Sequence, residues 1–377
     1  MWCYLHKHLC EKLVLRKEGI MQNPITTSWD DLLEGIHSPE QWWEKREEVK
    51  ARFLDLLRDE AAPSPPQDVK LKIEKQWHSE NFRIQYISYD VEEDERAYAY
   101  LAIPDDPAPE GGFPGVVCLQ GTTDWGAMRT LGLRPASDAP QGQKSIHGLT
   151  DARNLVRRGY ATISPEHFCM ATRRPPEGTA DTAAFYRRHP DWSAVGKSTY
   201  ENSIALSILA SLPQVNADRI GVTGHSLGGH GSIWLAAYNE RVKCAVPSCP
   251  GGAFRENPNA LAWSRDHWYI YFPQLREKML AGETIQCDLH EMMALIAPRP
   301  CLELFALNDG DFLMNQHRVT MHLKLGELYH LLGHNRAHAF LVFGDGHSMP
   351  DLSRASTANW MDRWLKYDGD PLGAWEL

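Results

Sequence analysis

The chain has 377 residues, of which 43% are apolar and 23% are charged, so it is long enough to bury a large core. Its net charge is −10 and no basic stretch stands out, which argues against a nucleic-acid partner because phosphate binding needs a positively charged face. No apolar run approaches the length of a membrane span. We therefore expect a globular protein without a membrane partner.

The eight cysteines are scattered along the chain and form no C-x-x-C pair. Cys118, Cys244 and Cys301 lie in apolar runs that are typical of buried strands. This distribution favours reduced core thiols over a disulfide framework and predicts a cytoplasmic location.

The first 20 residues do not resemble a signal peptide, because charges interrupt each apolar cluster. The residues before Met21, KEGI, can be encoded by a purine-rich ribosome-binding tract. The sequence therefore leaves open whether translation starts at Met1 or at Met21.

Residues 1–68 are predicted to form a helical extension. Ser38 is a candidate N-cap, Pro39 suits the first helical position, and Gln41 can close a capping box. The apolar residues that follow recur at helical spacing and predict a stripe that packs against another element. They are Trp42, Val49, Phe53, Leu56 and Leu57.

Residues 69–377 are predicted to form an α/β domain. Its first three apolar stretches, VKLKIEKQWHS, FRIQYISYDV and RAYAYLAIP, have little helical signal between them, which predicts antiparallel strands. From Pro114 onwards, short apolar runs alternate with helical stretches, which predicts a mostly parallel, doubly wound sheet. The runs are PGVVCLQG, GYATISPEH, RIGVTGHS, CAVPSCP, CLELFAL and AFLVFGDG. The segment at about 251–297 is too long for a plain connection and predicts a partly helical cap.

Ser226 is the candidate nucleophile. It lies in a G-x-S-x-G pattern, GHSLG, between an apolar strand and a helix. Small residues on both sides let the backbone pass close to the serine in the strained turn that this motif requires. The five-residue pattern alone arises often by chance, but the flanking strand and helix favour a nucleophile over a plain glycine-rich loop.

Asp309 and His347 are the candidate partners of this serine. A serine hydroxyl needs a base to take its proton and an acid to orient the base, and in such a sheet both follow later strands. Asp309 comes just beyond CLELFAL, after one intervening residue, and His347 comes directly after the last strand. Asp311 competes with Asp309 two positions on, and we place Asp309 ahead. An Asx turn at Asp309 and a helix-capping role for His347 are the non-catalytic alternatives.

The backbone N–H groups of Leu227 and Thr122 are the candidate oxyanion donors. The developing negative charge of the tetrahedral intermediate needs such donors, and the loss of one costs about 3 kcal/mol. Leu227 follows the nucleophile directly, and Thr122 lies in the loop VVCLQGTTDWG after the first parallel strand. Thr123 is the alternative in that loop.

Together, the stretches GHSLGGHG, LQGTT, APRPCLELFALNDGDF and GDGHSMP resemble the α/β-hydrolase superfamily. The fuller layout is similar to its dienelactone-hydrolase-like and acetyl-xylan-esterase-like bacterial branch, over roughly residues 40 to 367. Gln120 stands where the superfamily usually has a histidine, and Ser226 where dienelactone hydrolases have a cysteine. The resemblance implies a serine hydrolase that cleaves small esters without a cofactor.

We therefore expect a carboxylic-ester hydrolase that works through an acyl-enzyme, with its oligomeric state left open. A prolyl-oligopeptidase-like peptidase is an alternative, but the preceding region is too short for a propeller, whose blades need about 40 residues each. A non-catalytic binding protein on the same fold is the other alternative.

Two further groups of residues are weaker site candidates. The residues Arg173 and Arg174 follow a strand on the predicted catalytic edge and are candidates for binding an acidic or sugar substrate. His330, His334 and His338 have a spacing that could bind zinc on a continuous helix, but a glycine is expected to end the helix between the first two. We therefore expect no metal site there.

Overall fold

The structure is a computed structural model that describes residues 32–64, 69–133, 151–255, 257, 260–310 and 316–366. The question of a start at Met1 or Met21 and the competing acid Asp311 lie outside the described residues. No described helix is long and apolar enough to cross a membrane.

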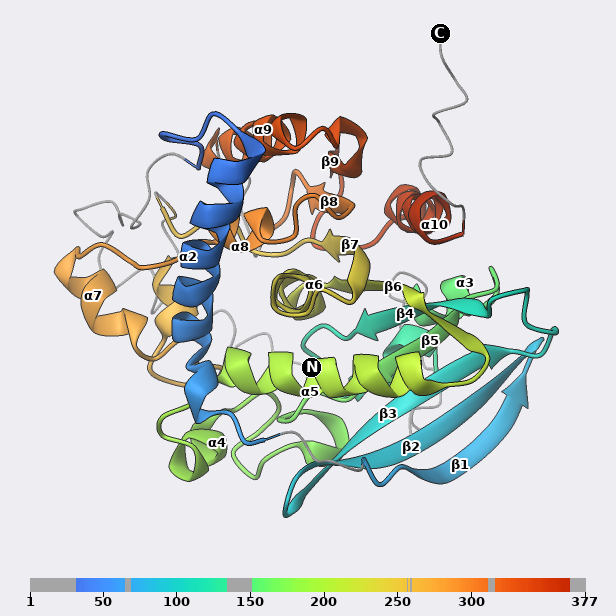
Figure 1. The fold of residues 1–377 in the computed structure, drawn as a ribbon. Coiled ribbons are helices and arrows are strands. Elements are labelled where there is room, and N and C mark those ends of the chain that lie inside the picture. Colours follow the sequence, from blue (N-terminus) through green and yellow to red (C-terminus); the bar gives the residue numbers. More distant parts are fainter. Residues whose placement is uncertain are drawn as a thin grey trace, which may run out of the picture.

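Nine described strands form one sheet at the centre of the molecule, in the order β1-β2-β3-β5-β4-β6-β7-β8-β9 (Figure 1). Their bounds are β1 (Lys72–Ser79), β2 (Phe82–Glu92), β3 (Glu95–Pro104), β4 (Phe113–Leu119), β5 (Ala161–Pro165), β6 (Val215–His225), β7 (Val242–Ser248), β8 (Cys301–Ala306) and β9 (His338–Phe343). The pairs β1-β2, β2-β3 and β3-β5 are antiparallel. The pairs from β5-β4 to β8-β9 are parallel. The predicted sheet is confirmed.

Helices cover both faces of the sheet, as predicted. Figure 1 shows α5 (Ala194–Ser211) and α6 (Leu227–Tyr238) on one face, and α3 (Asp151–Val156) and α10 (Asp351–Leu365) on the other. Each face has its own apolar core: Trp234 and Leu209 belong to the first, and Val156 and Met361 to the second. Burial on both faces explains why the parallel strands are continuous apolar runs. This is the α/β-hydrolase fold.

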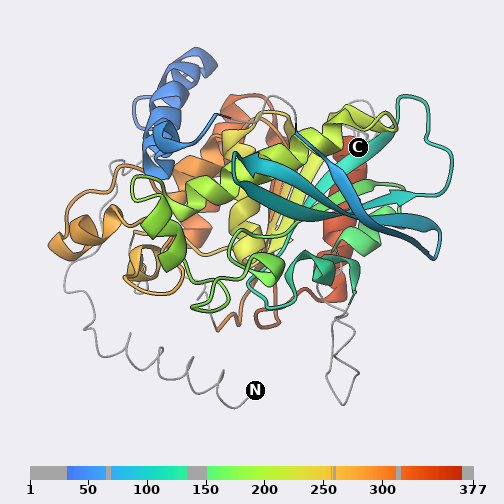
Figure 2. The same ribbon diagram turned by 90° about the horizontal axis from the view of Figure 1, so that it is seen from below.

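The amino-terminal helix α2 (Pro39–Leu57) begins where the sequence predicts. Ser38 is its N-cap and accepts a hydrogen bond from the N–H of Gln41 at 3.4 Å. The predicted capping box is wrong, because Gln41 Oε1 accepts from the N–H of His37 at 2.7 Å, one residue before the N-cap. All five residues of the predicted apolar stripe are buried. In Figure 2, α2 lies at the opposite end of the molecule from β1.

The remaining helices are short, apart from α9. The α-helices are α4 (Ala183–Arg188), α7 (Leu275–Ala281), α8 (Leu289–Ala294) and α9 (Gln316–Leu331). The 3-10 helices are η1 (Asp59–Ala61), η2 (Gly126–Leu131), η3 (Ala171–Arg173), η4 (Ala260–Ser264) and η5 (Asn335–Ala337). The segment at about 251–297 thus contains η4, α7 and α8 and is partly helical; its role as a cap stays a prediction. Helix α9 ends before Gly333, whose φ is +75°, as the sequence predicts.

The described cysteines are all buried and free. Cys118, Cys244 and Cys301 lie on β4, β7 and β8, so the prediction that they are core thiols is confirmed.

Candidate active site

Ser226 lies between the end of β6 and the start of α6, with φ +60° and ψ −119°. A non-glycine residue rarely adopts this conformation, and it persists only where its surroundings fix it. Here the N–H of Ser226 donates to the carbonyl of Ser248 at 2.9 Å, and its carbonyl accepts from the N–H of His230 at 3.1 Å. The predicted strained turn is therefore present, held by one bond to β7 and one within α6.

The two glycines of the motif are required by the close approach of β4. A Cβ atom on Gly224 would lie 2.5 Å from the carbonyl oxygen of Leu119, and one on Gly228 only 2.2 Å from the same oxygen. Real Cβ atoms do not approach backbone so closely. The motif therefore lets the last residue of β4 pack directly under the serine turn.

Asp309 and His347 come together at the carboxyl edge of the sheet. Asp309 Oδ2 lies 2.7 Å from His347 Nδ1, and the Asp309 side chain is fully buried while that of His347 is 21% exposed. The ring of His347 lies next to that of His225, with 4.5 Å between their centroids, and His225 directly precedes Ser226. The structure thus brings the three predicted catalytic residues to one edge, while their roles stay predictions.

The loop after β4 packs against the serine turn. A Cβ atom on Gly121 would lie 3.0 Å from the His225 carbonyl oxygen and 3.6 Å from Ser226 Cβ. The next residue is Thr122, one of the two predicted oxyanion donors. Leu227, the other, is the first residue of α6, where a backbone N–H has no acceptor within the helix. Both residues therefore lie near the serine turn, and their role as oxyanion donors stays a prediction.

The hydroxyl of Thr123 is used inside the same loop. Thr123 Oγ1 accepts a hydrogen bond from the N–H of Trp125 at 3.2 Å. Its side chain therefore shapes the loop, which gives Thr123 a local structural role.

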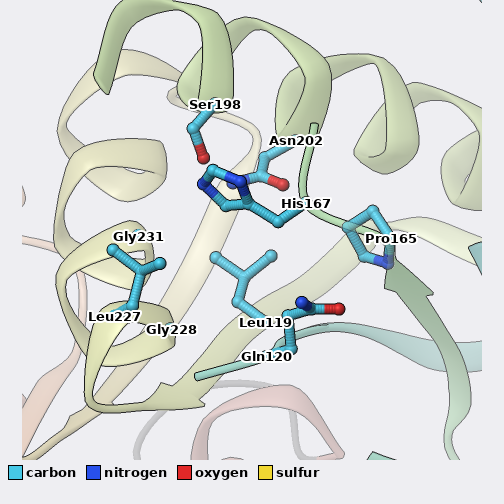
Figure 3. Close-up of a pocket in the computed structure, with 9 residues that line it drawn as sticks. All are labelled: Leu119, Gln120, Pro165, His167, Ser198, Asn202, Leu227, Gly228 and Gly231. Carbon is cyan, nitrogen blue, oxygen red and sulfur yellow. The ribbon is translucent and has the colours of Figure 1, made fainter. Parts of the chain in front are cut away.

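A small cavity lies beside this loop (Figure 3). It has room for about one water molecule. Its lining comes from β4 and its loop, the end of β5, and helices α5 and α6: Leu119, Gln120, Pro165, His167, Ser198, Asn202, Leu227, Gly228 and Gly231. The cavity therefore shares Leu227 with the predicted oxyanion site.

The cavity is lined by polar as well as apolar side chains. Gln120 is only 5% exposed; its Nε2 donates to the sulfur of Met170 at 3.3 Å, and its Oε1 has no hydrogen-bond partner among the described protein residues. Figure 3 shows the side chains of Ser198 and Asn202, both from α5, pointing toward the ring of His167. A buried acceptor without a partner costs free energy, which favours a polar occupant.

His167 connects the cavity to the segment at about 251–297. Its Nε2 lies 3.0 Å from the hydroxyl of Tyr269, and its Nδ1 lies 3.4 Å from the sulfur of Cys169. Burial lowers the pKa of His167 to about 3, so its ring is neutral at neutral pH. His167 is not among the site residues predicted from the sequence, although it lies just beyond a strand, as Asp309 and His347 do.

Arg173 lies in a cluster of charged residues and is buried there. Its guanidinium is buried and forms ion pairs with Glu95 and Glu201, and Lys197 binds the same two carboxylates at 2.8 and 2.9 Å. The suggestion that Arg173 binds an acidic substrate is therefore wrong. Arg174 is 54% exposed and lies 3.7 Å from Asp124.

Two of the three histidines with zinc-like spacing have other side-chain neighbours. His330 Nδ1 lies 3.2 Å from the side-chain oxygen of Asn335, and His338 Nε2 lies 3.3 Å from Nδ1 of His322. A different group, at the candidate active site, has metal-ligand chemistry: His225, Cys249 and His347 offer ligand atoms that all lie within 4.8 Å of one another.

The comparisons with known proteins identify the family. A family model described as glucuronyl esterase of fungi matches residues 145–333, about half of the chain. The provisionally named hydrolase YtaP of Bacillus subtilis (strain 168) is 27% identical over 265 residues, which cover 70% of this chain and 81% of YtaP.

Solved structures show the same fold. The glucuronoyl esterase from Solibacter usitatus superposes with a TM-score of 0.63 at 14% identity, covering 87% of this chain and 94% of that one. A family 15 carbohydrate esterase, a glucuronoyl esterase from Caldicellulosiruptor kristjansonii, has a TM-score of 0.61 at 19% identity, covering 92% and 91%. The chain therefore belongs to the glucuronyl esterase family and is a serine-type carboxylic-ester hydrolase.

Proposed function

We propose that Ser226, His347 and Asp309 are the catalytic triad of this esterase. The observation that carries the proposal is the hydrogen bond between Asp309 and His347 beside a serine in a strained turn. The carboxylate holds the proton on Nδ1, so the lone pair of Nε2 is presented to accept the serine proton. The buried position of Asp309 strengthens this orientation, because the surrounding protein replaces water.

In the first half of the reaction, Ser226 Oγ attacks the ester carbon while His347 accepts its proton. His347 then returns that proton to the departing alcohol, and an acyl-enzyme remains on Ser226. In the second half, His347 takes a proton from water, the hydroxide attacks the acyl group, and the proton goes back to Ser226. The backbone N–H groups of Leu227 and Thr122 stabilise the oxyanion in both halves.

We further propose that the acyl group is a hydroxylated one, such as the glucuronyl group in the family's name. The support is the cavity beside the oxyanion loop, where Gln120 Oε1 is buried without a hydrogen-bond partner among the described residues. The space is that of one water molecule, so it suits a single hydroxyl of a sugar that lies over its mouth. An unoccupied acceptor there favours a substrate that donates a hydrogen bond.

Acetyl esters are the second candidate, and the small size of the cavity favours them. An acetyl group needs little space, and Leu119 and Leu227 give the lining an apolar part. The two candidates differ in whether the side chain of Gln120 matters for recognition.

The free, buried cysteines support a reducing compartment, and we propose a cytoplasmic location. Among the described residues, six cysteines are free. Fractionation of the source cells with an antibody against this protein tests the location.

A fluorophosphonate probe tests the nucleophile. The wild type and the matched control Ser356→Ala, which lacks an exposed hydroxyl on α10, are expected to be labelled, and Ser226→Ala is not. A folded wild type that takes no label would instead favour a non-catalytic binding protein.

Two substrates test the acyl group: the methyl ester of glucuronic acid and 4-nitrophenyl acetate. Gln120→Met keeps the volume of the side chain and removes its amide. We expect the variant to lower kcat/KM for the glucuronate ester at least tenfold more than for the acetate. Equal effects on both substrates would favour the acetyl ester.

A further inference from the structure

We propose that His225, Cys249 and His347 form a site that binds a thiophilic divalent cation such as Zn²⁺ and that the bound ion inhibits the esterase. The three residues come from different strand ends: His225 closes β6, Cys249 directly follows β7, and His347 follows β9. Their ligand atoms all lie within 4.8 Å of one another, and they supply two nitrogens and one sulfur. This is a donor set that zinc prefers, whereas Mg²⁺ and Ca²⁺ prefer oxygen.

The surrounding hydrogen bonds already orient both imidazoles as metal ligands. Asp309 lies 2.7 Å from Nδ1 of His347, and Ser248 Oγ lies 3.1 Å from Nδ1 of His225. Zinc-binding histidines are typically held in this way, with one ring nitrogen on the metal and the other on a carboxylate or another oxygen. The pairing that prepares His347 for catalysis therefore also prepares it for a metal.

Zinc binding requires the three ligand atoms to move closer together. Tetrahedral zinc with ordinary bond lengths places its ligand atoms roughly 3.3 to 3.6 Å apart, so a separation of 4.8 Å must shrink by about 1.2 to 1.5 Å. The His347 side chain is partly exposed and follows β9 in a loop, so it can move toward the buried Cys249. Binding replaces the thiol proton of Cys249 by the metal, and that proton leaves to solvent. A water molecule can take the fourth position.

The ion inhibits because it occupies the atom that must accept the serine proton. Zinc on Nε2 of His347 removes the lone pair on which the attack by Ser226 depends. This consequence rests on the proposed function, whereas the binding of the metal does not. The two can therefore fail separately.

Inhibition is measured with the purified full chain after chelator treatment, with 4-nitrophenyl acetate as substrate. We expect micromolar Zn²⁺ to inhibit the wild type, EDTA to reverse the inhibition, and Mg²⁺ to have no effect. In Cys249→Ala, the Zn²⁺ concentration for half inhibition rises at least tenfold, with each rate normalised to the zinc-free enzyme. Cys244→Ala, which removes a buried thiol from β7 itself, is the matched control and keeps the wild-type sensitivity.

Cobalt provides a readout that does not depend on catalysis. Bound to this site, Co²⁺ gives a thiolate-to-metal charge-transfer band in the near ultraviolet, which is expected in the wild type, in Ser226→Ala and in Cys244→Ala, and absent in Cys249→Ala. No such band in the wild type would overturn the proposal, as would equal zinc sensitivity of Cys249→Ala and the wild type. A charge-transfer band without inhibition would support the metal site and contradict the proposal that the bound ion inhibits the enzyme through His347.

Discussion

Asp309 and His347 are 38 residues apart in the chain, and their side chains are hydrogen-bonded at 2.7 Å. The parallel pairing of β8 with β9 creates this contact, because it carries the loops after both strands to the same edge of the sheet. The last residue of β8, Ala306, lies opposite the last residue of β9, Phe343. The register of one strand pair therefore sets the acid against the base.

Asp309→Asn is expected to lower kcat by roughly 10⁴-fold while the fold is kept, because an amide can hold the imidazole in the wrong tautomer. Steady-state kinetics and a thermal melt of the same preparation separate these effects. Asp345→Asn is the matched control, since Asp345 is an exposed carboxylate two residues before His347. If Asp309→Asn keeps more than a tenth of the activity, another group orients the base.

Gly228→Ala is expected to damage the serine turn. The added Cβ would lie 2.2 Å from the carbonyl oxygen of Leu119, and because this neighbour is backbone it cannot rotate away. We expect at least a hundredfold loss of kcat/KM and a destabilisation of about 1 to 3 kcal/mol.

Gly326→Ala is the opposite case and serves as the control. Gly326 lies within α9 and a Cβ atom there meets nothing within 4 Å. Because alanine has the higher helix propensity, this change is expected to leave activity unchanged and to stabilise the protein by up to about 1 kcal/mol. Urea denaturation measures both variants, and equal effects would show that the glycine at 228 is not required by packing.

The sequence predicted the sheet well because burial on both faces leaves a strong pattern. Strands such as β4 and β8 are apolar at nearly each position, and helical stretches separate the parallel strands. The order Ser226, Asp309, His347 could also be proposed from the sequence, since each residue lies just beyond a predicted strand. These predictions depend on local composition and on the chain order of one motif.

Contacts between distant segments could not be predicted in the same way. From the sequence, Arg173 is a candidate substrate-binding arginine, yet Glu95 and Glu201, from β3 and α5, form ion pairs with it. Cys249 reads as a core thiol, yet it lies beside two histidines from other strand ends. Neither neighbourhood has a periodicity or spacing in the sequence, because it is made by the packing of loops.

Arg173→Met is expected to destabilise the protein by about 3 to 5 kcal/mol. The change leaves the buried carboxylate of Glu201 and the partly buried carboxylate of Glu95 with less positive charge, and an uncompensated buried charge is costly. Arg187→Met is the matched control: Arg187 is exposed and pairs with Glu177 at the surface, where an ion pair contributes less than about 1 kcal/mol. Chemical unfolding measures the free energy of unfolding of both variants. Similar losses would mean that the ion pairs of Arg173 contribute no more to stability than a surface pair.

We predict from the lowered pKa of Glu303 that the protein loses stability in acid. Burial of this β8 carboxylate raises its pKa, but Arg318 and His322 lower it more strongly, to about 2. In the unfolded chain the pKa is about 4.3, so the folded state binds the proton less well. This contribution to stability is fully present above about pH 4.3 and is lost as pH falls toward the pKa of the folded state, by about 1.4 kcal/mol per pH unit.

Glu303→Gln is therefore expected to be less stable than the wild type at pH 7 and to lose less stability on acidification. Urea unfolding between pH 7 and pH 3 measures both slopes, and Glu327→Gln, an exposed carboxylate on α9, should keep the wild-type slope. A Glu303→Gln slope equal to that of the wild type would assign the acid sensitivity to other carboxylates.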